Sequence, residues 1–342
     1  MSEKTRKLIL LLAIACNFAI SIGYSNFESF DPMVKWSAAY ADTDLYIGEY
    51  YGTRSHKFAV HRLVTPYLAR LSPGIPASFF GPGRAFNQTS IVAFKFAIIN
   101  VVFLVATSIV LYYLNRGFGL SETLAAFGAL LFFCLPMVIR QGALPIVDTS
   151  YWFFLSLAVL AVQRQNIWLL VGATLIGVFA KEQVLWVILF ILLAPFTKTR
   201  RFVLLCAVGP AFVAYSMVVF GSGLSVDNYY LWGSSLPLIL KAVNRLFSIN
   251  GLFQLWMSFG FLWLYCVYAL IRCRPPTILQ RWAWFIPAVL FATRLLGVSG
   301  VMRHMTITFV VVIPLALIGI SKWLSLGEPI NCVKNERGSE IS

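Results

Sequence analysis

The side chains best suited to chemistry are acids and bases that interrupt a strongly apolar sequence. The longest polar segment, residues 27–71, contains the neighbouring carboxylates Asp42 and Asp44. A carboxylate within roughly 2.6–3.2 Å of an acceptor hydroxyl can take its proton as a general base. This segment is therefore the first candidate for a catalytic site.

The spacing of Asp42 and Asp44 limits what they can do together. Their side chains would share one side of an extended segment but would point about 200° apart on a helix. Joint binding of a divalent metal therefore requires a loop conformation, and the Asp-Thr-Asp sequence permits such an ion without demanding one. No cofactor is predicted with certainty. Tyr46 lies four residues after Asp42 and would be its neighbour on a helix.

Further charged candidates interrupt or border apolar runs: Asp148, Lys181, Glu182, Arg303 and His304. Asp148 falls four residues into such a run. An ion at the bilayer centre costs at least about 2.5–3.5 kcal/mol, so such side chains should pair or face a wet cavity. For Lys181 and Glu182, a structural ion pair at a hairpin tip is the alternative to a functional role. For Arg303 and His304, interfacial anchoring by snorkelling competes with phosphate binding.

The composition defines the class of protein that positions these residues. Of 342 residues, 59% are hydrophobic and 12% are charged, whereas soluble domains have about 25% charged residues. This predicts an all-α polytopic membrane helix bundle, with one transmembrane catalytic domain over residues 1–323 and a disordered cytoplasmic tail over residues 324–342. Much of the net charge of +14 lies in short loops beside apolar runs, where it meets anionic membrane lipids. No nucleic-acid partner is expected.

The apolar runs predict about ten transmembrane helices, with both termini in the cytoplasm. The number of spans depends on whether residues 167–196 form one long helix or a hairpin of two short ones. This stretch is apolar except for Lys181, Glu182 and Gln183. If this stretch is a hairpin, the short cytoplasmic loops are rich in arginine and lysine, as the positive-inside rule requires. If it is one long helix, most of these arginines and lysines would face outward. We therefore predict a hairpin. A bacterial inner or plasma membrane is the expected location, with residues 25–90 forming a long external loop that carries surface helices.

Motifs of familiar soluble enzymes are absent from the sequence. It contains no Walker loop, GxGxxG, HExxH or GxSxG, so ATP hydrolysis and the usual metalloprotease or serine-hydrolase chemistries lack support. The six cysteines fall in apolar runs or on the predicted cytoplasmic side, which leaves no external disulfide framework and no metal-ligand spacing.

Taken in order, the charged elements resemble the GT-C superfamily of membrane glycosyltransferases. The first elements are an acidic DxxxY sequence at residues 42–46 and a His-Arg-Leu-x-x-Pro sequence at residues 61–66. Asp148 opening a middle span, Lys181-Glu182 at an external helix junction and Arg303-His304 before a late span complete the pattern. The resemblance covers most of the chain, although each element is short.

This resemblance implies transfer of a sugar from a polyprenyl-phosphate carrier to a lipid, glycan or protein acceptor on the non-cytoplasmic face. In that superfamily an acidic residue of the first external loop is the catalytic base, which here is Asp42, or Asp44 if the loop is turned differently. Cationic external residues hold the carrier phosphate. The substrate-binding and phosphate-binding residues would then be Arg303, Lys181, Arg62, His61, Tyr46, Asp148, Glu182 and His304. Inversion by direct displacement is the expected outcome.

The sequence departs from two well-marked branches of that superfamily. It lacks the His-Pro-Asp-Glu element of some lipid-anchor mannosyltransferases and the large soluble C-terminal domain of oligosaccharyltransferase subunits, which leaves the sugar, the acceptor and the metal requirement open. One alternative is a transporter or flippase of a lipid-linked or anionic solute, with Asp148, Lys181 and Glu182 as a midplane ion-coupling network. A non-catalytic assembly subunit, or an O-antigen polymerase or ligase using Arg303 and His304, are others.

Overall fold

The structure, a computed structural model, describes residues 3–29, 50, 62–72, 88–144, 146–221, 248–295 and 301–324, and every regular element in these ranges is helical. The longest helices are α1 (Glu3–Ser29), α4 (Gln88–Gly117) and α10 (Lys198–Gly221). The other α-helices are α3 (Val64–Leu71), α5 (Glu122–Leu131), α6 (Pro136–Gln141), α7 (Asp148–Gln163), α8 (Ile167–Gly177), α9 (Val187–Leu193), α12 (Ile249–Phe259), α13 (Leu262–Tyr268), α14 (Thr277–Trp282), α15 (Phe285–Leu295), α16 (Val301–Met305) and α17 (Phe309–Trp323). Short turns of 3-10 helix, η2 (Phe132–Cys134), η3 (Glu182–Trp186) and η6 (Thr306–Thr308), and a π-helical turn, η5 (Ala269–Cys273), complete the set.

Several helices have the length and composition of membrane spans. Four segments of the described chain are apolar and long enough to cross a bilayer: Thr5–Asn26, Ile91–Gly117, Lys198–Val218 and Arg303–Trp323. The bent pair formed by α12 and the helix that follows it would add a fifth if it counts as one span. The protein is therefore helical and membrane-embedded, as its composition predicts. The number of about ten spans stays a prediction.

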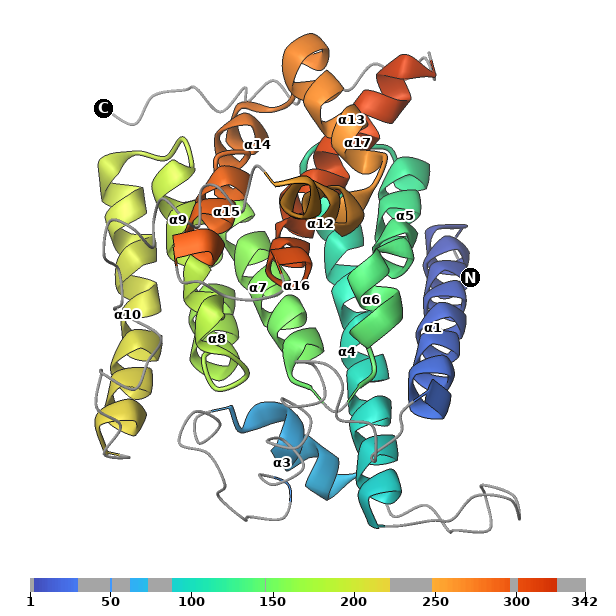
Figure 1. Ribbon diagram of the computed structural model, residues 1–342. Coiled ribbons are helices and arrows are strands. Elements are labelled where there is room, and N and C mark those ends of the chain that lie inside the picture. The colour runs from blue at the N-terminus through green and yellow to red at the C-terminus, as the bar shows by residue number, and fades with distance from the viewer. Residues whose placement is uncertain are drawn as a thin grey trace.

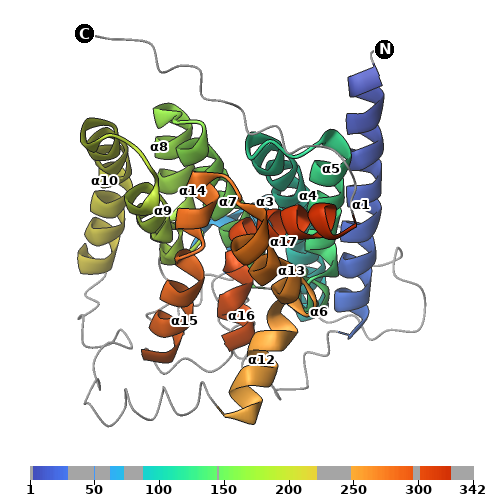
Figure 2. The same ribbon diagram turned by 90° about the horizontal axis from the view of Figure 1, so that it is seen from above.

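The helices form two layers. A row of neighbours runs α1, α4, α7, α8, α10 across the molecule, and each helix of the row packs on the next (Figure 1). The later helices, α12 to α17, cover one face of this row (Figure 2). α3 lies across one end of the row, where it contacts α4.

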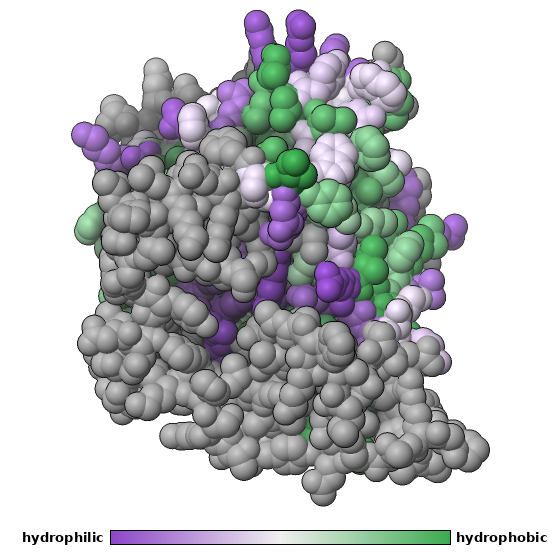
Figure 3. Space-filling view, in the orientation of Figure 1, coloured by the Kyte–Doolittle hydropathy of each residue, from purple (hydrophilic) through white to green (hydrophobic). Residues whose placement is uncertain are grey.

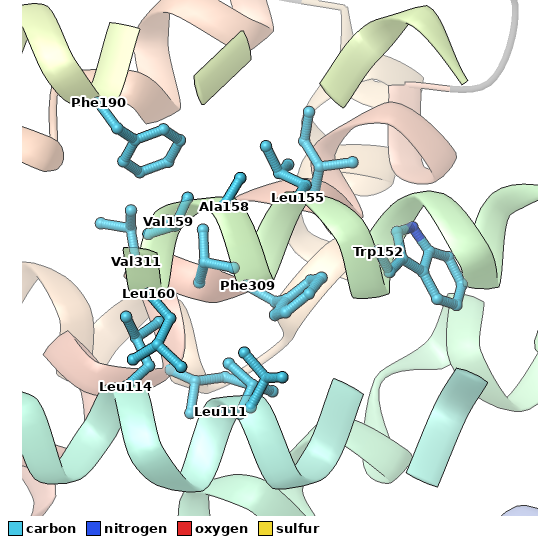
Figure 4. Close-up of a cluster of buried hydrophobic side chains, with 14 of the residues drawn as sticks. Leu111, Leu114, Trp152, Leu155, Ala158, Val159, Leu160, Phe190, Phe309 and Val311 are labelled. Carbon is cyan, nitrogen blue, oxygen red and sulfur yellow. The ribbon is translucent and has the colours of Figure 1, made fainter. Parts of the chain in front are cut away.

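The main hydrophobic core lies between the two layers. It is built around α7 and joins side chains of α4, α9 and α17 (Figure 4): Leu111, Leu114, Trp152, Leu155, Ala158, Val159, Leu160, Phe190, Phe309 and Val311. Nearly every residue of α17 is buried, in contrast to α1 and α10, which expose much of their surface. α17 therefore runs through the interior of the bundle. The residues just before it, Arg303 and His304, are brought inside with it.

Two apolar runs of the sequence, residues 121–139 and 251–271, each predict one span but are interrupted in the structure, and each interruption has a local cause. The apolar run 121–139 breaks before Pro136, which lacks an amide hydrogen and holds Leu135 in an extended conformation. The run 251–271 breaks at Gly260, whose φ of 54° ends α12, and the next helix leaves at a bend of 85°. Helix α7 begins only at Asp148. Asp148 is thus the first residue of its helix, as expected for an aspartate that opens a middle span, and does not lie four residues into it.

The apolar stretch 167–196 folds back on itself. α8 ends at Gly177, the chain turns, and η3 and α9 lead it back. Arg200, near the start of α10, donates a hydrogen bond to the carbonyl oxygen of Gln165, directly before α8. The stretch therefore has two arms that begin and end together, which is the path that a hairpin requires. Its orientation in a membrane stays a prediction.

Candidate functional site

Asp148 is the centre of a buried ion cluster. Its side chain is 2% exposed, and Lys181 Nζ donates to its Oδ1 at 2.7 Å. Arg303 Nε donates to the other carboxylate oxygen, Oδ2. These three side chains come from the start of α7, the turn after α8 and the short helix α16. The structure thus joins three residues that the sequence indicated separately.

A second ion pair lies beside the first. Arg62 donates to Glu182 through two nitrogens, Nη2 to Oε1 at 2.8 Å and Nε to Oε2 at 3.2 Å. Such a bidentate pair fixes the orientation of both groups. Each side chain is 21% exposed, so this pair is more accessible than the one at Asp148. Lys181 and Glu182 are neighbours in sequence but bind different partners, so they do not form the predicted pair at a hairpin tip.

The two pairs together carry surplus positive charge. Among the described residues they comprise three cations and two carboxylates, which leaves one net positive charge. His304 is partly buried and interacts electrostatically with Lys181, Arg303 and Asp148. Charges interact more strongly where water is scarce, so Lys181 and Arg303 are held firmly against Asp148.

Asn100 positions the backbone that leads to Asp148. Its Nδ2 donates to the carbonyl oxygens of Leu144 and Ile146 at 2.6 and 3.2 Å, and its Oδ1 accepts from Thr149 Oγ1 at 2.5 Å. Non-helical backbone inside a membrane protein needs partners of this kind, because no water is available to bind its carbonyl groups. One buried amide therefore fixes both sides of Asp148.

Asn26 acts in the same way on the preceding segment. Its Nδ2 donates to the carbonyl oxygen of Ile139 at 2.8 Å, and its Oδ1 accepts from the backbone amide of Ala143 at 3.0 Å. α1 is thereby attached to the end of α6 and to the chain that follows it. Two asparagines from different helices hold the segment between α6 and α7.

The helix α3 is fastened to the same end of the bundle. Thr65 Oγ1 donates to Ser150 Oγ at 2.8 Å, and the amide of Val64 donates to the carbonyl oxygen of Phe179 at 3.3 Å. With the ion pair of Arg62 just before it, α3 is tied to the first turn of α7 and to the turn after α8. α3 forms the end of the polar segment 27–71 in which the predicted catalytic residues lie.

The opposite end of α7, about 24 Å away along the helix, carries charges of a different kind. There Arg164 lies over the ring of Tyr113, with its guanidinium carbon 5.6 Å from the ring centroid. Lys7 and Glu122 are 3.8 Å apart and largely solvent-accessible. Hydrophilic side chains gather at the top rim of the molecule and again at mid-height (Figure 3). Buried, mutually bound charges thus distinguish the Asp148 end.

The cluster can hold an anion against fixed cations, which is what a phosphate leaving group requires. No family model, curated protein or solved structure matches the chain. The candidates Asp42, Asp44, Tyr46 and His61 lie outside the described residues, and their roles stay predictions. Within the described ranges, no three histidine, cysteine or acidic side chains are grouped so as to hold a metal ion.

Sequence reasoning missed Tyr151 and the two asparagines. The Nζ of Lys181 lies 5.4 Å from the centroid of the Tyr151 ring, which is a cation–π contact. Tyr151 follows Asp148 by three residues, a spacing that places both on one face of a helix, and this was the available signal. For Asn100 the signal was an amide inside an apolar run, since such a group must find a partner there.

Proposed function

We propose that this protein is a membrane glycosyltransferase that moves a sugar from a polyprenyl-phosphate carrier to a lipid, glycan or protein acceptor. The supporting observation is the buried cluster in which Lys181 and Arg303 bind the two oxygens of Asp148 beside a second, more accessible cation, Arg62. Fixed positive charge in a water-poor site stabilises the charge that develops on a departing phosphate. The cluster adjoins α3, the end of the polar segment that also contains Asp42 and Asp44.

The proposed reaction is a direct displacement that inverts the anomeric carbon. The acceptor hydroxyl oxygen attacks that carbon, the bond between the carbon and the carrier's phosphate oxygen breaks, and the bonding electrons leave with polyprenyl phosphate. The hydroxyl proton passes to the carboxylate of Asp42, or of Asp44. Lys181, Arg303 and Arg62 stabilise the departing phosphate, so no acid is needed at the leaving group.

The proposed topology places the cluster on the non-cytoplasmic side, with about ten spans and both termini in the cytoplasm. Its support is the difference between the two ends of α7. The end at Gln163 adjoins accessible lysines and arginines in short connections, as cytoplasmic loops do. The end at Asp148 adjoins α3 and Arg62 directly before it.

A second candidate is a transporter or flippase of a lipid-linked anion. The observation in its favour is that Asp148 is almost completely buried among helix ends, which is typical of ion-coupling sites in transporters. In that case the protein would bind the carrier without consuming it. Release of free polyprenyl phosphate from a sugar-linked carrier is therefore the decisive measurement.

The experiment compares purified wild type, Asp42→Asn and Asp44→Asn in detergent, supplied with a panel of polyprenyl-phosphate sugars and candidate acceptors, with and without divalent metal. We expect wild type to release polyprenyl phosphate and one of the two variants to lose release while still binding polyprenyl phosphate. Glu122→Gln, at the opposite end of the bundle, is the matched control and should keep activity. No release by wild type with any donor would favour transport.

A further inference from the structure

Tyr151 differs from the polar residues around it. The first turn of α7 contains Asp148, Thr149, Ser150 and Tyr151. The first three are satisfied: the carboxylate binds two cations, Thr149 Oγ1 donates to Asn100, and Ser150 Oγ donates to the backbone and accepts from α3. The Tyr151 hydroxyl has no hydrogen-bond partner in the described part of the chain.

This hydroxyl belongs to the ion cluster and is not directed into lipid. Tyr151 is 1% exposed. The ammonium of Lys181 lies 5.4 Å from its ring centroid, and its hydroxyl interacts electrostatically with the carboxylates of Asp148 and Glu182. The ring of Tyr151 thus packs against Lys181, while its hydroxyl lies unpartnered near the charges of the site.

An unpartnered hydroxyl in such a place is costly. A buried donor left without an acceptor lowers stability by about 1–3 kcal/mol, whereas a phenylalanine ring would make the same contact with Lys181 at no such cost. The contact with Lys181 thus explains why an aromatic ring is present at position 151, but it does not explain the hydroxyl group. An acceptor supplied by a ligand would satisfy the oxygen.

We propose that the Tyr151 hydroxyl binds the substrate by donating a hydrogen bond to a phosphate oxygen of the carrier held at Lys181. This rests on the proposed function, since it assigns a further contact to the same ligand. An anion at the Lys181 ammonium would lie beside the tyrosine, because the ring forms one wall around that ammonium. Within the described ranges the hydroxyl has no acceptor, so a phosphate oxygen bound at Lys181 would supply one.

The test is Tyr151→Phe, which keeps the ring beneath Lys181 and removes only the oxygen. Binding of polyprenyl phosphate to the purified protein in detergent is measured by calorimetry, and thermal stability is measured on the same sample. We expect binding to weaken by about ten- to a hundredfold, as for loss of a hydrogen bond to a charged group. The melting temperature should stay the same or rise, because the orphan hydroxyl is gone.

Tyr113→Phe is the matched control, because the Tyr113 ring also lies beneath a cation, Arg164, at the other end of α7. It should bind polyprenyl phosphate as the wild type does. Unchanged binding by Tyr151→Phe would overturn the inference, and so would a lower melting temperature, which would show that the hydroxyl has a structural partner.

The failures of the two proposals differ. If wild type binds polyprenyl phosphate and Tyr151→Phe binds it equally, only the role of the hydroxyl is wrong. If wild type does not bind polyprenyl phosphate, the proposed function fails and the contact fails with it. A farnesyl alcohol without phosphate should bind wild type and Tyr151→Phe equally; a difference would contradict the assignment to a phosphate oxygen.

Discussion

Arg303 donates a hydrogen bond to Asp148 across 155 positions of sequence, and Lys181 occupies the other oxygen of the same carboxylate. One acid therefore joins three distant segments of the chain. It also separates two cations that would otherwise repel each other in a buried site.

Asp148→Asn should be strongly destabilising, because it leaves two buried cations without their shared carboxylate. Removing one partner of a buried ion pair costs about 3–5 kcal/mol. Lys181→Met should cost less, since Arg303 still neutralises the acid. Melting temperatures in detergent measure both effects, and Glu122→Gln is the control for loss of an accessible acid. Equal melting temperatures for Asp148→Asn and Glu122→Gln would refute the cluster.

The pair formed by Arg62 and Glu182 should tolerate exchange of its charges. Arg62→Glu alone places two acids together and should lower both stability and binding of polyprenyl phosphate. The double variant Arg62→Glu/Glu182→Arg should recover stability by about 1 kcal/mol, the upper range for partly exposed pairs. It should not recover binding fully, because the cation has moved. A double variant no more stable than the single one would show that the pair does not hold α3.

Gly319→Ala should disrupt the contact between α13 and α17. A Cβ atom there would lie 2.3 Å from the carbonyl oxygen of Tyr265, and neither backbone can yield easily. Overpacking of this kind costs about 1–3 kcal/mol. The control is Gly172→Ala in α8, where a Cβ meets nothing within 4 Å; it should stabilise by up to about 1 kcal/mol, as alanine favours helices. If Gly319→Ala melts at the wild-type temperature, the close approach of these helices is wrong.

The two ends of the bundle should lie on opposite sides of the membrane. Tyr67 on α3 and Thr199 on α10 are both exposed, whereas Lys181 is too buried to report accessibility. In a variant without the exposed Cys134 and Cys206, Tyr67→Cys should react with an impermeant thiol reagent from outside intact cells. Thr199→Cys should react only after permeabilisation. Labelling of both from the same side would contradict the hairpin and the proposed placement of the site.

The sequence was sufficient to find the charged residues of the site but not their partners. Asp148, Lys181 and Arg303 stood out because ions are rare and costly in apolar runs. Their pairing depends on how distant helices pack. Lys181 and Glu182 show the difficulty: the backbone at Lys181 is extended, with φ −166° and ψ 134°, so adjacent side chains point to opposite sides. One reaches Asp148, and the other reaches Arg62.

The helices themselves were predicted better than their limits. Hydropathy identifies the apolar runs, but it does not predict the helix break before Pro136 or the bend at Gly260. The break and the bend are local and leave each run apolar. Tyr151 and Asn100 were missed because a neutral polar residue carries no charge to reveal it. Whether its hydrogen bonds are satisfied depends on neighbours that only the folded chain supplies.

The burial of α17 and the late position of Arg303 have a consequence for biosynthesis. The ribosome makes Asp148 and Lys181 well before Arg303, so the partly made chain holds these two as a neutral pair. Arg303, shortly before α17, binds the other oxygen of the same carboxylate and changes the charge of the three groups from neutral to +1. If a phosphate binds here as proposed, the full positive charge of its site exists only after Arg303 and α17 have been made.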